Sequence, residues 1–176
     1  MTENENTQGQ QEAVNTSESE RQQFLTFHLD DEDYGVDITQ VMEIRGWSET
    51  TRLPNTPDYV MGIINLRGVV VPVMDIRRRF GMEAATLNDK SVVIILSSTE
   101  RSIGLLVDGV TDILEVTSSD IKAPPSVSNS MEADFLQGLV AKEQRMVVIL
   151  NPDKLFSIRI LDEAHRRVTE VAEESL

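Results

Sequence analysis

Short stretches of alternating or continuous apolar residues recur along the chain and predict strands joined by turns. Residues 24–29 are predicted to be a strand, with Leu25, Phe27 and Leu29 on one face. Residues 91–96 are apolar almost throughout, which predicts a strand covered on both faces. Further strands are predicted over 34–38, 62–66, 69–76, 103–107, 110–116, 135–140 and 145–150, although 110–116 also fits helical spacing. Many short strands with little helix predict an all-β barrel or a pair of barrels.

Two connections between these strands have a clear turn pattern. Asn65-Leu66-Arg67-Gly68 separates two apolar runs, so it predicts a tight turn that carries an arginine. Asp30–Asp33 lacks the glycine and distal glutamate of a calcium loop and is predicted to be a solvated hairpin turn. Pro72 cannot donate to a sheet ladder, which predicts an edge strand or a bulge at that position.

Helix is predicted only in short pieces. One helical turn is expected near 38–44 and another over 57–62, the second closed by Gly62. Asn151 is expected to cap a helix that begins at Pro152. Residues 1–21 are polar and predicted to be a disordered tail, 22–160 the folded domain, and 161–176 an amphipathic helix or frayed tail.

Charge and composition narrow the class of protein. The chain has 176 residues, a formal net charge of −14 and no cysteine. The negative charge argues against nucleic acid or an anionic membrane as the partner, because both need clustered Lys and Arg. No apolar run approaches the ~20 residues of a membrane helix, and no secretory pattern begins the chain, so a cytoplasmic protein is predicted. The basic cluster Arg77–Arg79 is expected to be a solvated face.

The sequence contains no recognisable catalytic constellation. His28 and His165 have no metal-ligand neighbours at helical spacing, and no phosphate-binding glycine loop is present. Asp75 could form an acid–base pair with Asp108 or Asp112 in a β-barrel hydrolase, but nothing in the sequence brings them together. We therefore expect a binding module that is not an enzyme and uses no cofactor or metal.

Several segments together resemble the CheW family of bacterial chemotaxis coupling proteins. The segments are 32–46, 51–57 and 62–77, which includes Asn65-Leu66-Arg67-Gly68 and Val71-Pro72-Val73, and also 103–114. The resemblance runs from about Phe24 to Phe156. It implies two five-stranded SH3-like β-barrels packed about a shared apolar core. It also implies a non-enzymatic adaptor that joins the hairpin tip of methyl-accepting chemoreceptors to the regulatory domain of the histidine kinase CheA, within membrane-associated receptor arrays.

The resemblance also implies where receptors bind. The receptor-side candidates, with Ile44 added because it could line an apolar groove beside Val41, are Val41, Glu43, Ile44, Gly62, Arg67, Gly68, Val92, Gly104, Val110 and Ile113. The kinase surface matches no motif. For the valines and Ile113 core packing is the alternative, and for the glycines an ordinary turn or bulge.

Two hypotheses concern particular candidates. Glu43 is expected to pair with Arg67. Gly62 and Gly104 are expected to admit a partner's backbone, so that Gly62→Asp abolishes receptor binding with little change in melting temperature. The other readings of the whole chain are a CheW-like domain of a CheV or CheA type protein and, in a different class, the carboxylate hydrolase.

Overall fold

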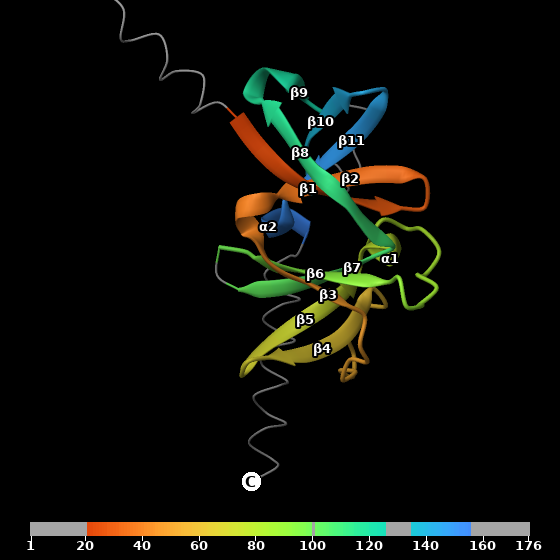
Figure 1. Ribbon diagram of the computed structural model, residues 1–176. Helices are drawn as coiled ribbons and strands as arrows, with labels where there is room; N and C mark the ends of the chain where they lie inside the picture. The colour runs from red at the N-terminus through yellow and green to blue at the C-terminus, as the bar shows by residue number, and fades with distance from the viewer. Residues whose placement is uncertain (1–20, 100, 126–134, 156–176) are drawn as a thin grey trace, which may run out of the picture.

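The computed structural model describes residues 21–99, 101–125 and 135–155, which are mainly strands and turns. A six-stranded sheet has the order β8-β1-β2-β11-β10-β9, and a five-stranded sheet has the order β3-β6-β7-β5-β4 (Figure 1). We call them the first barrel and the second barrel. The strands are β1 (Arg21–Leu29), β2 (Glu32–Asp37), β3 (Val41–Gly46), β4 (Val60–Leu66), β5 (Val69–Asp75), β6 (Val92–Ser97), β7 (Ser102–Val107), β8 (Gly109–Thr117), β9 (Ile121–Lys122), β10 (Leu136–Lys142) and β11 (Arg145–Leu150).

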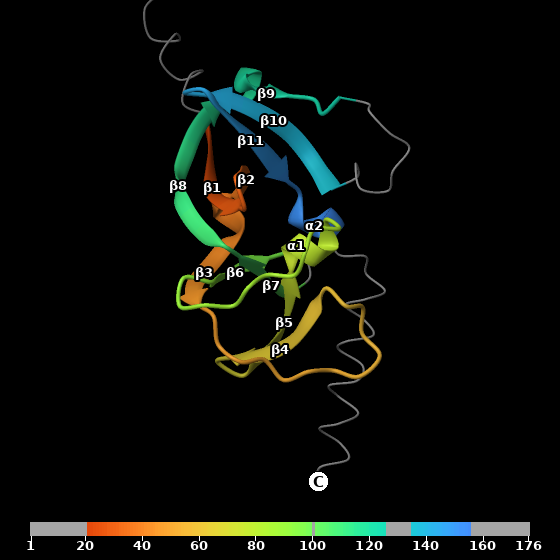
Figure 2. The ribbon, with the colours of Figure 1, turned by 90° about the vertical axis from the view of Figure 1, so that its right-hand side faces the viewer.

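The predicted all-β fold with two barrels is confirmed. The chain begins in the first barrel with β1 and β2, builds the second barrel from β3 to β7, and returns through β8, so the two barrels lie one above the other (Figure 2). The hairpins β1–β2, β4–β5, β6–β7 and β10–β11 are antiparallel, and parallel pairs join β2 to β11 and β5 to β7. The first barrel differs from the expected five strands because the two-residue strand β9 adds a sixth.

Three apolar clusters account for the strand patterns. Val93 and Ile95 of β6 pack inside the second barrel, whereas Ile94 and Leu96 pack into a cluster that also takes residues from β1 and β2. Successive side chains of a strand point to opposite faces, so the continuous apolar run of β6 serves two cores at once. This cluster, the shared core, joins the barrels as predicted. A third cluster around Phe24 fills the first barrel.

The helices of the described residues are short. They are η1 (Ile38–Gln40), α1 (Ile76–Arg79), η2 (Ser118–Asp120) and α2 (Pro152–Leu155). The predicted turn at Ile38 and the predicted cap at Asn151 are confirmed, since the Asn151 side chain accepts from the Asp153 amide at 3.0 Å. Helix α1 was not predicted. None of these helices has the length and apolarity needed to cross a bilayer.

Two local predictions are wrong. Residues 57–60 form a single turn, in which the Val60 amide donates to the Pro57 carbonyl at 3.0 Å, but the turn does not reach Gly62, because β4 begins at Val60 and Gly62 pairs with Val73. Pro72 does not mark an edge, since β5 lies between β4 and β7. The pairing with β7 begins only at Val73, so the backbone N–H that Pro72 lacks is not needed for that ladder. The bulge lies in β4, between Val60 and Gly62.

Other predictions concern the ends of the chain and one loop. Arg21 is the first residue of β1, at the end of the predicted tail. Residues 1–20, the loop residues 126–130 and the amphipathic helix predicted from residue 161 lie outside the described part of the chain.

Candidate functional site at the junction of the barrels

Strand β3 carries three candidate positions on two faces. Val41 is partly buried and packs against the shared core. After a bulge, Glu43 pairs with Ile95 and Ile44 with Ile94. Paired residues share a face of the sheet. Ile44 therefore lies on the side of the shared core, yet it is 46% exposed.

Strand β8 supplies matching positions from the first barrel. Val110 pairs with Phe27 and packs against the shared core, and Ile113 pairs with the core residue Leu25 but is 56% exposed. Val92, at the start of β6, packs against the same cluster. We group these five positions of both barrels as the inter-barrel face; its residues are Val41, Ile44, Val92, Val110 and Ile113, of which the three valines pack against the shared core. It offers exposed apolar side chains beside partly buried ones.

The turn between β4 and β5 brings Arg67 to Glu43. Arg67 has a φ of 50° and Gly68 a φ of 86°, and the Asn65 side chain accepts from the Gly68 amide at 2.8 Å. Arg67 Nη2 lies 3.1 Å from Glu43 Oε2, so the expected pair is confirmed. The side chains are 74% and 30% exposed. An exposed pair of this kind contributes only ~0–1 kcal/mol, and its main effect is to hold the guanidinium against β3.

Reversing the charge of Glu43 tests that positional effect. Glu43→Lys is expected to lower the free energy of unfolding by less than ~1 kcal/mol, measured by urea titration of Trp47 fluorescence, because the pair is solvated. The double variant Glu43→Arg with Arg67→Glu should recover that stability. If the receptor contact that the family resemblance implies lies here, co-sedimentation with receptor membranes should weaken in both variants, since in both the cation moves away from its place on the turn. Unchanged stability and co-sedimentation in Glu43→Lys would rule out a positional effect.

Two candidate glycines are packed against this chain itself. A Cβ on Gly62 would lie 2.4 Å from the Thr51 carbonyl oxygen, and Gly62 has a φ of 139°. A Cβ on Gly104 would lie 3.0 Å from Val93 Cγ1 and 3.2 Å from Val73 Cγ2, inside the second barrel. Both glycines are buried. Their close approach is to neighbouring strands and loops of the second barrel, which corrects the expectation that a partner's backbone meets them.

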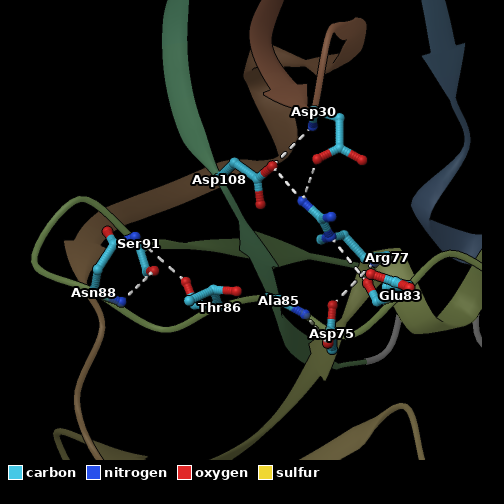
Figure 3. Close-up of polar contacts among 9 residues, drawn as sticks. All are labelled: Asp30, Asp75, Arg77, Glu83, Ala85, Thr86, Asn88, Ser91 and Asp108. Carbon is cyan, nitrogen blue, oxygen red and sulfur yellow. Dashed lines mark hydrogen bonds and ion pairs between the residues drawn. The ribbon is translucent and has the colours of Figure 1, made fainter.

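A polar cluster missed by the sequence analysis joins the two barrels (Figure 3). Arg77 Nη1, from α1 of the second barrel, lies 2.8 Å from Asp30 Oδ1 and 2.7 Å from Asp108 Oδ2. Asp30 lies in the β1–β2 turn of the first barrel, and Asp108 lies where the chain passes from β7 to β8. Arg77 Nε donates to the Glu83 carbonyl at 3.0 Å, and the Asp30 amide donates to Asp108 at 2.8 Å.

The electrostatics of this cluster correct the prediction of a solvated basic face. The Arg77 side chain is only 13% exposed. Burial alone lowers the pKa of its guanidinium, but the hydrogen bonds and charges of Asp30 and Asp108 outweigh burial and raise that pKa. Arg79 lies over the rings of Tyr59 and Phe135. The available signal in the sequence was an arginine directly after a buried strand, with aspartates at the ends of two other strands.

The aspartates considered for acid–base chemistry have different partners. Asp75 is buried and accepts from the backbone amides of Arg77 and Ala85 at 3.0 and 3.1 Å. Asp108 binds Arg77, and Asp112 lies 3.4 Å from Arg145. Their separate structural contacts give no support to a paired-carboxylate site.

Comparison with known proteins identifies the family. The model of the CheW-like domain matches residues 23–159. The chain is 41% identical over 136 residues to the chemotaxis protein CheW of Klebsiella aerogenes, covering 77% of this chain and 82% of that protein. It is 37% identical over 145 residues to a probable chemotaxis protein CheW of Rhizobium etli, covering 82% and 94%. The crystal structure of scaffolding protein TtCheW from Thermoanaerobacter tengcongensis superposes with a TM-score of 0.72 at 32% identity, covering 79% and 90% of the two chains. The chain belongs to the CheW-like domain family.

Proposed function

We propose that this protein is a non-enzymatic chemotaxis adaptor that couples chemoreceptors to the histidine kinase CheA at membrane-associated receptor arrays. The observation that carries the proposal is the inter-barrel face. A receptor hairpin tip is helical, and a helix docks by placing spaced apolar side chains on an apolar surface. Ile44 and Ile113 are exposed on strands of different barrels, and the same strands carry Val41 and Val110, which pack on the shared core. The scaffold and chemotaxis names of the relatives support the same function.

The other receptor-side candidates divide into two groups. Glu43, Arg67 and Gly68 form the polar edge beside β3, where the ion pair fixes the arginine. Gly62 and Gly104 act indirectly, by keeping the second barrel closely packed. The kinase surface is left unassigned.

Co-sedimentation with receptor-containing membranes, with and without purified CheA, tests the proposal. The chain should pellet with receptor membranes and should increase the amount of kinase that pellets with them. A well-folded chain that bridges no receptor and kinase would overturn the assignment.

The exposed isoleucines give the sharper test of the surface. Ile44→Asp and Ile113→Asp should each weaken receptor binding about tenfold, because a buried apolar contact of ~1–2 kcal/mol is replaced by a desolvated charge. Their melting temperatures should change little, since both side chains are about half exposed. Met146→Asp is the matched control, because Met146 is 56% exposed on β11, outside the inter-barrel face. Equal losses in all three variants would argue against a local contact.

A further inference from the structure

A pocket lies away from the inter-barrel face. Its volume is about 510 Å³, and we call it the seam pocket. Its lining residues are Asp30, Asp31, Glu32, Tyr34, Phe80, Met82, Phe135, Leu136 and Val148. In Figure 2, β3 and β8 lie at the left of the molecule, whereas α1 and β10, next to the pocket, lie to the right. None of the lining residues belongs to the predicted receptor-side set.

The pocket wall is aromatic and comes from both barrels. Tyr34 of β2 lies 5.4 Å from Phe80, which follows α1, and Phe80 stacks on Phe135 with ring centroids 5.0 Å apart. Phe27 continues this row behind Tyr34 at 5.9 Å. Tyr34 and Phe135 are almost fully buried, and Phe27 is part of the shared core. These buried rings hold the wall rigid, and the half-buried Phe80, Met82, Leu136 and Val148 supply the apolar surface that could receive a bulky side chain.

The rim of the pocket is acidic. Asp30 and Asp31 form the β1–β2 turn, Glu32 begins β2, and all three are exposed. Asp30 is engaged by Arg77, and Glu32 accepts from the Tyr34 hydroxyl at 2.8 Å. No described residue forms an ion pair with Asp31. Burial, and next the bond to Glu32, raise the pKa of the Tyr34 hydroxyl, so it remains a neutral donor.

We propose that the seam pocket binds a peptide segment of a partner protein in which a bulky apolar side chain is flanked by Lys or Arg. The apolar side chain would contact Phe80, Phe135 and Met82, and the cation would face Asp31. Charge complementarity selects this occupant, because the rim and the net charge of −14 both disfavour an acidic segment. This site goes beyond the proposed receptor contact and does not depend on it.

Binding of a labelled probe to the full chain tests the site. The probe is the peptide acetyl-Gly-Lys-Leu-Phe-Arg-Gly-amide, followed by fluorescence anisotropy. Matched peptides replace Lys and Arg with Glu, or Leu and Phe with Ser. The cationic apolar peptide should bind below about 1 mM, and both matched peptides should bind at least tenfold more weakly. Equal binding of the acidic peptide, or no binding of the cationic one, would overturn the proposal.

Protein variants locate the contact. Asp31→Lys should weaken the cationic peptide about tenfold, whereas Glu49→Lys, the same charge change at another exposed position, should have little effect. In the methionine-methyl NMR spectrum the peptide should shift Met82 and leave Met42 and Met146 unchanged. Equal affinity in Asp31→Lys, or shifts confined to Met42 and Met146, would place the peptide elsewhere.

The protein's own C-terminal segment is the competing occupant. It follows Leu155, whose carbonyl accepts from Arg79 beside the Phe135 ring. If the unmodified chain does not bind the peptide and Phe156→Ser shifts the Met82 methyl signal, that segment fills the pocket in the native chain and the proposal is overturned. Asp31→Lys should retain receptor co-sedimentation, so failure at this pocket is distinguishable from failure of the adaptor function.

Discussion

Gly62→Ala is expected to lower the free energy of unfolding by about 3–5 kcal/mol, a larger loss than either Glu43→Lys or Arg77→Gln should cause. A φ of 139° is strained for every residue with a Cβ, at a cost of ~1–3 kcal/mol. The added methyl group would also lie 2.4 Å from the Thr51 carbonyl oxygen, a backbone atom that already accepts from the Ile63 amide at 2.9 Å. Relief requires a shift of the bridge between Thr51 and Ile63, which adds to the strain.

Two other glycines provide matched controls for this prediction. Gly68 has a φ of 86° but open space around a new Cβ, so Gly68→Ala should cost only about 1 kcal/mol. Gly46 has neither restriction, so Gly46→Ala should be nearly neutral. Urea unfolding can be followed through Trp47, the single tryptophan, which packs against the core of the second barrel. Equal losses in all three variants would contradict the packing around Gly62.

This result changes how a Gly62 variant should be interpreted. The sequence suggested that Gly62→Asp would abolish receptor binding with little change in melting temperature. The structure requires the larger aspartate to disturb β4 at the bulge, so stability and receptor binding should fall together. Loss of receptor binding in Gly62→Asp is therefore no proof of direct contact. Ile44 and Ile113, whose side chains are exposed, are the more informative positions.

The hydrophobic pattern predicted most of the strands, because successive residues of a strand face opposite sides of the sheet. Their polarity therefore shows which sides are buried. The continuous run in β6 follows from the two cores that it covers, and Leu25, Phe27 and Leu29 of β1 face the shared core while Phe24 faces the core of the first barrel. The turn at Arg67 was also predictable, because Asn65 and Gly68 supply the backbone angles and the side-chain acceptor locally. These features depend on residues close together in the sequence.

Contacts between residues far apart in the sequence could not be predicted from such local patterns. Gly62 appears in the sequence as a helix end, because only the fold brings Thr51 against it. Arg77 appears as one member of a basic cluster, because its aspartates lie 47 and 31 residues away, at Asp30 and Asp108 (77 − 30 and 108 − 77). The seam pocket likewise exists only where the two barrels meet.

Arg77→Gln is expected to lower the free energy of unfolding by about 2–3 kcal/mol. Breaking a fully buried ion pair costs ~3–5 kcal/mol, because it leaves a buried charge uncompensated. The cost here is smaller because the Asp30 side chain is 55% exposed and can recover water, whereas Asp108 is only 23% exposed. The glutamine also cannot donate to Asp30, Asp108 and the Glu83 carbonyl together.

Arg78→Gln gives the control for that substitution, because it removes the same charge from the same helix. Arg78 is 39% exposed, lies 3.8 Å from Asp75 and donates to the Asp58 carbonyl, so its loss should cost less than about 1 kcal/mol. Since Arg77 connects α1 of the second barrel to a turn of the first, only its variant should also weaken receptor binding at the inter-barrel face. Equal stability of the two variants in urea titrations would show that the Arg77 cluster does not hold the barrels together, and the candidate binding surface would then depend on the shared apolar core alone.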